Sequence, residues 1–239
     1  MLAVFFVIAF FAAALSAIAG FGSALILISA ASLMFDIKWS IAMTTFFYCF
    51  NTGLKTYHFR TYIDWHLVFK LSLFAMPGVF IGAYCLLYLE ASWLMLGLAS
   101  ISMSYLLLDI FKLIPKFRVN DVVLLVSGFI YGFISGAVGS GSLIKAIVFK
   151  QINLPKEAFV ASMAASALPL NVIKLSLFLS ASLLALNDVP AILALLVASY
   201  MGTIFGKHLL MKVNQTLFNH LVRIVLLLLS LGLVARIVF

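Results

Sequence analysis

The stretch Ser16-Ala17-Ile18-Ala19-Gly20-Phe21-Gly22-Ser23 returns, about half a chain later, as Ser135-Gly136-Ala137-Val138-Gly139-Ser140-Gly141-Ser142. Each copy interrupts a long apolar segment, and each opens one half of the protein. Backbone that is freed from a helix at membrane depth persists only where protein or a polar cavity satisfies its hydrogen bonds. Paired, glycine-broken segments at corresponding positions of two halves therefore point to the binding site of a transporter.

The composition is that of a membrane protein. Of the 239 residues, 66% are hydrophobic and only 9% are charged, whereas soluble domains carry about 25% charged residues. Apolar stretches of about 20 residues, the length a helix needs to cross hydrocarbon, recur from end to end. The first stretch has no basic start and continues to Phe35, so it is read as mature structure and not as a cleaved signal peptide. We expect one multi-pass membrane domain over residues 1–239.

Apolar runs bounded by charged residues define eight segments. They cover residues 2–35, 39–57, 66–89, 92–111, 122–149, 157–181, 189–207 and 216–238. The first and fifth segments are unusual, because both carry the glycine-serine break near their middle. Each is either one tilted, broken helix or a hairpin that enters the membrane and returns.

Basic residues assign the connections between segments to two sides of the membrane. Basic residues are concentrated in the second, fourth, fifth and seventh connections. The only charged residue of the third connection is Glu90, and that of the sixth is Asp188. The positive-inside rule places the basic connections in the cytoplasm. The fourth and fifth connections share a side only if the fifth segment turns back. By symmetry the first segment turns back too, entering from the opposite face, so that the two tips meet near the midplane.

The predicted fold is an all-α polytopic membrane protein built from two inverted repeats, residues 1–114 and 119–239. Each repeat consists of a Gly/Ser-broken hairpin, or a long broken helix, followed by three transmembrane helices. Gly78 and Gly82 in the third segment match Gly202 and Gly206 in the seventh. This Gly-x-x-x-Gly spacing lets membrane helices approach closely, and we expect it to serve packing alone.

The breaks are the first candidate binding residues. Helix N-termini at a buried break favour anions through free N–H groups and the helix dipole. Glycine allows close approach of the backbone, and serine hydroxyls add donors. The candidates are Gly20, Gly22 and Ser23 in the first break and Gly139, Ser140, Gly141 and Ser142 in the second. Tight packing of helices through small residues is the alternative reading.

Polar residues inside apolar helices give further candidates. Asn51 corresponds to Asn171 in the second half, with Lys55 and Lys174 about one turn later. The amides bind either an oxyanion or a neighbouring helix. Lys174 and Lys145 either neutralise a bound anion or extend to the membrane surface. Lys55 is interpreted as marking the cytoplasmic end of its segment.

The acidic residues narrow the substrate class by their positions. All seven lie in loops or near segment ends, so no mid-membrane carboxylate is expected for binding a cation. No nucleophile, metal-binding or nucleotide-binding motif is present, and we expect neither an enzyme nor a cofactor. The formal charge of +8 is scattered over loops, which indicates membrane orientation and attraction of anions and not nucleic-acid binding.

The chain resembles the TauE/SafE family of membrane permeases. The resemblance rests on the two breaks, on Tyr62-Ile63-Asp64-Trp65, and on Pro77-Gly78 with Gly82. It implies a multi-pass transporter of the bacterial cytoplasmic (inner) membrane that exports sulfite, sulfoacetate or related organosulfonates. The family's breaks typically read Gly-x-Gly-Gly-Gly, whereas this chain has serine at positions 23, 140 and 142, which bears on the choice of substrate.

Together these features predict a secondary transporter or facilitator of a small anion that works by alternating access. An anion channel of the same fold is the alternative, and a structural subunit is disfavoured because it needs no paired breaks. The expected partners are the anion and the lipid bilayer, and a homo-oligomer is compatible with the sequence.

Overall fold

The computed structural model describes residues 2–19, 22–111, 117–152 and 154–210, and all regular structure within these residues is helical. The helices are α1 (Leu2–Ala19), α2 (Ser23–Ser32), α3 (Ile37–His58), α4 (Trp65–Tyr88), α5 (Ala91–Ile110), α6 (Asp121–Val138), α7 (Ser142–Gln151), α8 (Lys156–Ser180) and α9 (Val189–Leu210), with short turns η1 (Arg60–Tyr62) and η2 (Leu186–Asp188). The predicted all-α class is confirmed. The segment predicted over residues 216–238 lies outside the described residues.

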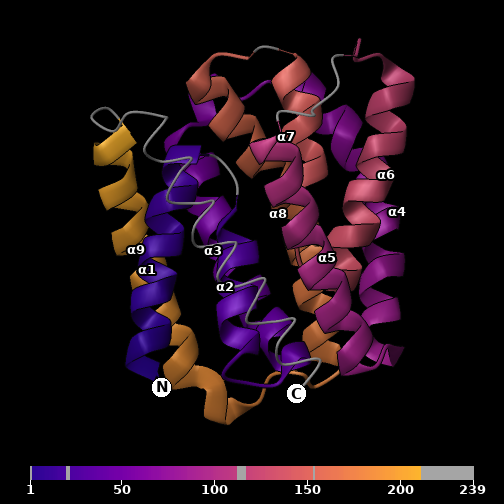
Figure 1. Cartoon of the computed structure of the whole chain (residues 1–239). Helices are drawn as coiled ribbons and strands as arrows, with labels where there is room; N and C mark the ends of the chain where they lie inside the picture. The colour runs from indigo at the N-terminus through magenta and orange to yellow at the C-terminus, as the bar shows by residue number, and fades with distance from the viewer. Residues whose placement is uncertain (1, 20–21, 112–116, 153, 211–239) are drawn as a thin grey trace.

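The helices run between two ends of one bundle (Figure 1). At the end that we call the Asp36 end, Lys38 Nζ donates to the Leu87 carbonyl over 2.9 Å and Trp39 Nε1 donates to Asp188 Oδ1 over 3.0 Å. These bonds bring together the α2–α3, α4–α5 and α8–α9 connections. These connections carry fewer basic residues than those at the opposite end, which agrees with the grouping of connections that the sequence predicts.

The opposite end, called the Asp64 end, brings together the α3–α4 connection and the starts of α6 and α8. The Asp64 backbone N–H donates to Ser162 Oγ over 3.0 Å, joining the α3–α4 connection to the start of α8. Lys70, in the second turn of α4, and Asp121, the first residue of α6, form an ion pair of 2.6 Å. Basic Arg60, Lys70 and the chain leading into α6 thus share one end of the bundle.

The first broken segment folds back on itself. At the Asp36 end, the ring centroids of Phe5 in α1 and Phe35, just after α2, are 5.8 Å apart. The chain therefore leaves this end along α1 and returns to it along α2 (Figure 1). Gly22, immediately before α2, has φ +98°, a left-handed conformation that glycine adopts without steric cost.

The second broken segment folds back in the opposite direction. Its first helix, α6, starts at the Asp64 end and stops at Gly139, which has φ +86°. Gly141 then packs so closely along α6 that an added Cβ would lie 2.5 Å from the Tyr131 carbonyl oxygen. Next, α7 returns to the Asp64 end, where the rings of Phe149 and Phe159 are 6.3 Å apart.

The two tips extend beyond the middle of the bundle. A Cβ on Gly139 would contact Ile28 and Ile41, and Ile41 lies only one turn from the start of α3 at the Asp36 end. In the other hairpin, Ser16 contacts Lys55 in the last turn of α3, at the Asp64 end. The tips therefore pass each other, and the expectation that they meet near the midplane is wrong.

Close backbone packing fixes each hairpin to a long helix. Gly78 and Gly82 of α4 pack against the backbone of Phe129 and Phe133 in α6, leaving no room for a side chain. In the same way, Gly202 and Gly206 of α9 pack against the backbone of α1 at Phe10 and Ala14. The packing role predicted for both Gly-x-x-x-Gly pairs is confirmed.

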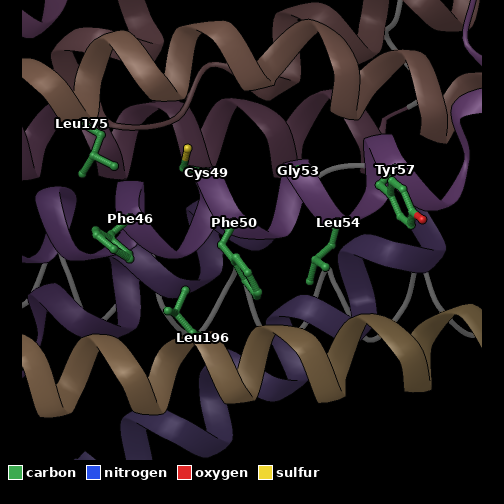
Figure 2. Close-up of a pocket in the computed structure, with 8 residues that line it drawn as sticks. All are labelled: Phe46, Cys49, Phe50, Gly53, Leu54, Tyr57, Leu175 and Leu196. Atoms are coloured by element: carbon green, nitrogen blue, oxygen red, sulfur yellow. The ribbon is translucent and has the colours of Figure 1, made fainter.

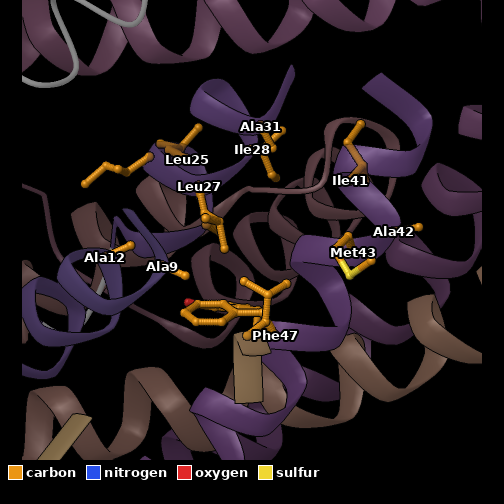
Figure 3. Packing of buried hydrophobic residues seen from close by; sticks show 14 of the residues in the cluster. Ala9, Ala12, Leu25, Leu27, Ile28, Ala31, Ile41, Ala42, Met43 and Phe47 are labelled. Carbon is orange, nitrogen blue, oxygen red and sulfur yellow. The ribbon is translucent and has the colours of Figure 1, made fainter. Parts of the chain in front are cut away.

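The core between the two breaks is apolar. Buried side chains from α1, α2 and α3 interlock between the two arms of the first hairpin and α3 (Figure 3), among them Ala9, Ala12, Leu25, Leu27, Ile28, Ala31, Ile41, Ala42, Met43 and Phe47. Such packing excludes water and makes every polar group placed within it costly unless it is bonded.

Four helical stretches in the described part of the chain are long and apolar enough to cross a membrane: Trp65–Tyr88, Asp121–Val138, Glu157–Ser180 and Leu186–Leu209. The helix α3 is not one of them although it connects the same two ends. Its polar residues, including Thr44, Asn51, Thr52 and Lys55, lower its hydropathy but are buried inside the bundle.

Candidate functional site at the two helix breaks

Three lysines are buried in the interior of the bundle. Lys55 and Lys145 are 0% exposed and Lys174 is 1% exposed. Among the described side chains, no aspartate or glutamate is buried with them. A buried ammonium is unfavourable without a compensating charge or hydrogen bonds, so the centre is electropositive and lacks an anionic partner from its own described residues.

Lys174 binds the end of the helix that leads into the second break. Its Nζ donates to Ser135 Oγ over 3.2 Å and to the Gly139 carbonyl oxygen over 3.1 Å. The C-terminal carbonyls of a helix carry partial negative charge, so the ammonium stabilises the end of α6. The proposed extension of Lys174 to the membrane surface is therefore wrong for this structure.

Lys55 binds the first broken segment in the same manner. Its Nζ donates to Ser16 Oγ over 3.1 Å and lies 5.6 Å from the ring centroid of Tyr48. The sequence pattern assigns Lys55 to a cytoplasmic helix end, but the structure buries it completely. Near this end of α3, Ser16 of α1 accepts the hydrogen bond of the lysine inside the bundle.

The two lysine–serine contacts occupy matching positions in the two halves. Both join residues that are 39 apart in the chain. Ser16 and Ser135 are the first residues of the two glycine-serine stretches, and each precedes the first glycine of its break by four positions. Each broken segment is thus attached, just before its break, to a lysine on an inner helix.

The two asparagines have different surroundings. Asn51 Nδ2 donates to Thr203 Oγ1 over 2.8 Å and to Ser199 Oγ over 3.3 Å. Its Oδ1 lies 3.3 Å from the Ser16 hydroxyl. These contacts join α3 to α9 and α1, which favours the interhelical reading for Asn51.

Asn171 is less tightly held. Its Nδ2 donates to Thr52 Oγ1 over 3.4 Å, a long and weak hydrogen bond. The residue is 1% exposed and lies two positions after Pro169, a proline inside the continuous helix α8. A weakly bonded amide can exchange its partner for a stronger acceptor, so Asn171 remains a candidate for ligand binding.

The serines of the breaks are also buried. The hydroxyls of Ser140 and Ser142 are 3.4 Å apart, and both residues are under 5% exposed. Ser23 begins α2, and its hydroxyl has no hydrogen-bond partner among the described residues. Gly22 and Gly141 provide no side-chain cap for α2 and α7. Both short helices thus begin at a break with donors available. Gly20 lies outside the described residues.

Unsatisfied hydroxyls identify polar positions that the sequence motif does not single out. Within the described part of the chain, Ser29 on α2 and Thr44 on α3 are buried without a hydrogen-bond partner, as is Ser23. A buried hydroxyl normally binds a partner, and an unpaired one indicates a place for water or a ligand. Ser29 has no signal in the sequence beyond being a serine in an apolar run.

Lys145 distinguishes the second break from the first. Its Nζ donates to the Met163 carbonyl over 2.7 Å and to Tyr131 Oη over 3.2 Å, and lies 4.6 Å from the Tyr131 ring centroid. It follows Ser142 by three residues, whereas Ile26 occupies that place after Ser23. The predicted extension of Lys145 to the surface is wrong, because the side chain is enclosed.

An apolar groove lies on the flank of the bundle, beside this centre. It has a volume of about 500 Å³ and is lined by residues of α3, α8 and α9: Phe46, Cys49, Phe50, Gly53, Leu54, Tyr57, Leu175 and Leu196 (Figure 2). Its lining is hydrocarbon-like and unsuited to an anion. The polar centre itself is closed, since its lysines and serines are almost fully buried.

These features define a multi-pass membrane transport protein with an occluded, electropositive centre between two broken helices. Residues 5–233 match the family described as Sulfite exporter TauE/SafE. The chain belongs to this family of membrane transporters, which are not enzymes. No curated protein and no solved structure gives a significant match.

Proposed function

We propose that the protein is a secondary transporter or facilitator of a small oxyanion, which it carries by alternating access. The observation that supports this best is Lys174, a buried cation bound to the carbonyl end of a broken helix with no buried carboxylate among the described side chains. A buried cation without a carboxylate partner is stabilised by a bound anion, and in a transporter that anion is the substrate, which enters and leaves.

The arrangement of the hairpins suggests how access could alternate. One hairpin enters from the Asp36 end and the other from the Asp64 end, and each carries the same lysine–serine contact. We infer that residues 1–114 and 119–239 are inverted repeats. In transporters built this way, two repeats move relative to each other around a site at their interface.

The candidate residues are suited to an oxyanion. Lys174 can exchange the neutral Ser135 hydroxyl for a charged oxygen, which forms a stronger hydrogen bond. The uncapped starts of α2 and α7 supply backbone N–H groups and a favourable dipole. Additional donors come from residues at or beside the breaks: Ser23, Ser140, Ser142 and Asn171.

The family indicates sulfite or an organosulfonate-like compound as cargo. Export across a bacterial cytoplasmic membrane is physically favourable for such an anion. The inside-negative potential contributes about 2.3 kcal/mol per charge per 100 mV in the outward direction. Export can therefore proceed without a coupling ion.

Uptake into proteoliposomes tests the proposal. The purified protein is supplied with sulfite, sulfoacetate, thiosulfate or acetate, beside Lys174→Gln and the control Lys38→Gln, which alters a lysine at the Asp36 end. We expect saturable sulfite or sulfonate flux that Lys174→Gln lowers at least tenfold and Lys38→Gln preserves. Absence of flux for every anion rejects the substrate class, and ohmic single-channel currents favour the channel.

A further inference from the structure

Lys55 is a buried cation that the proposed transport mechanism leaves without a role. It is 0% exposed, and its ammonium donates to Ser16 Oγ over 3.1 Å. A hydroxyl is a neutral acceptor and does not compensate a buried positive charge. A lysine kept only to join α1 to α3 could be replaced by a neutral donor at lower desolvation cost.

The surroundings of Lys55 match those of Lys174. Each lysine donates to the serine that stands four residues before the first glycine of a break. Each also lies near the tip of one hairpin, Lys55 toward the Asp64 end and Lys174 toward the Asp36 end.

We propose that Lys55 is a second anion-binding residue, equivalent to Lys174, and that the anion passes between them during transport. This inference rests on the proposed function. At each tip the anion replaces the serine hydroxyl as acceptor for the ammonium, because a charged oxygen is the stronger acceptor. Ser16 and Ser135 then hold their lysines when no anion is bound there.

The unpaired hydroxyl of Ser23 provides independent support at the first tip. Ser23 is 0% exposed, has no hydrogen-bond partner among the residues that the structure describes, and begins α2 directly after the break. The first break therefore combines a buried cation with a free donor. Ser140 and Ser142 contact each other at the second break, so an anion there would exchange that contact for its own.

Sulfite binding to detergent-solubilised protein tests the role of Lys55 directly. Dissociation constants are measured from the sulfite-dependent rise in the unfolding temperature, together with flux in proteoliposomes. Lys55→Gln is compared with Lys174→Gln, with Lys55→Arg, and with Lys38→Gln on the same helix α3. We expect Lys55→Gln to weaken sulfite binding about tenfold or more, Lys55→Arg to restore much of it, and Lys38→Gln to leave it unchanged.

Each result decides the matter. If Lys55→Gln binds sulfite like the wild type while Lys174→Gln does not, the inference is rejected and the proposed function stands. If the wild type neither binds nor carries any oxyanion, the proposed function fails first. If Lys55→Gln does not fold, Ser16→Ala is tested in its place. This variant removes the hydroxyl that binds Lys55, so sulfite binding should stay equal or become tighter. Weaker sulfite binding by Ser16→Ala rejects the inference.

Discussion

Asn171 Nδ2 donates to Thr52 Oγ1 over 3.4 Å, where α8 crosses α3, and the two residues are 119 apart in the chain. Ser16 and Ser135, and likewise Lys55 and Lys174, have this same separation. In this register Thr52, and not Asn51, is the counterpart of Asn171. If the halves are inverted repeats, their two-fold axis passes through this contact, because only counterparts on an axis touch each other.

Asn51 and Asn171 should therefore respond differently to removal of the amide. Asn51→Ala removes the contacts with Ser199, Thr203 and Ser16, and we expect it to lower the free energy of unfolding by about 1–2 kcal/mol. Asn171→Ala loses one weak bond and should be folded normally but bind sulfite several-fold more weakly. Unfolding in detergent with and without sulfite measures both effects.

Thr52→Val serves as the control, because it removes the partner of Asn171 but leaves the amide. It should bind sulfite like the wild type. If Asn171→Ala instead lowers stability as much as Asn51→Ala and leaves sulfite binding intact, both asparagines are interhelical links and Asn171 is not a site residue.

Gly132→Ala should destabilise the protein. A Cβ at this position would overlap the Ala75 backbone in α4, which cannot move away as a flexible side chain could. Overpacking of this kind costs about 1–3 kcal/mol. Gly53→Ala is the matched control, since its nearest atom would be Leu168 Cδ1 at 3.9 Å. Thermal unfolding should separate the two variants, and equal stability would show that α4 and α6 can move apart.

The sequence is sufficient to predict the breaks and the packing glycines. Gly22 and Gly139 mark the breaks because only glycine readily takes the positive φ found there. Gly78 and Gly202 signal close packing by their spacing. Such features are local, and residue type carries the information.

The surroundings of a long side chain depend on residues that are distant in the sequence, and the interpretation of Lys55 as a cytoplasmic helix end was wrong for this reason. Lys55 resembles a helix-end lysine because Arg60 and the charged turn follow closely, yet it is fully buried and donates to Ser16 of α1. The depth of the tips depends on how α1 packs beside α9, and the Ser29 hydroxyl lacks a partner only because of its packing. These outcomes depend on residues distant in sequence.

Gly139→Ala should impair the protein more than Gly22→Ala. Both replacements place a side chain at positive φ, which costs about 1–2 kcal/mol. The new Cβ of Gly139→Ala would also lie 2.7 Å from Ile28 Cδ1 and 2.9 Å from Ile41 Cγ2. The new Cβ of Gly22→Ala would have no described atom within 4 Å. Adding Ile28→Val removes Cδ1 and should recover part of the loss in unfolding temperature. No recovery would place the defect in the backbone alone.

The two hairpins predict which connections share a side of the membrane. Cysteines introduced singly at Asn120 and Gln151, after Cys49 and Cys85 are replaced by alanine, should react with an impermeant maleimide from the same side, because α6 and α7 together do not cross. Cysteines at Glu90 and Asn187 should react only from the other side.

Basic residues gathered at the Asp64 end indicate that this end faces the cytoplasm. Labelling of intact cells and of inverted vesicles makes the comparison, with labelling after detergent lysis as the control for reactivity. Reaction of Asn120→Cys and Gln151→Cys from opposite sides would mean that the segment crosses the membrane, and both the hairpin and the inverted-repeat proposal would then be wrong.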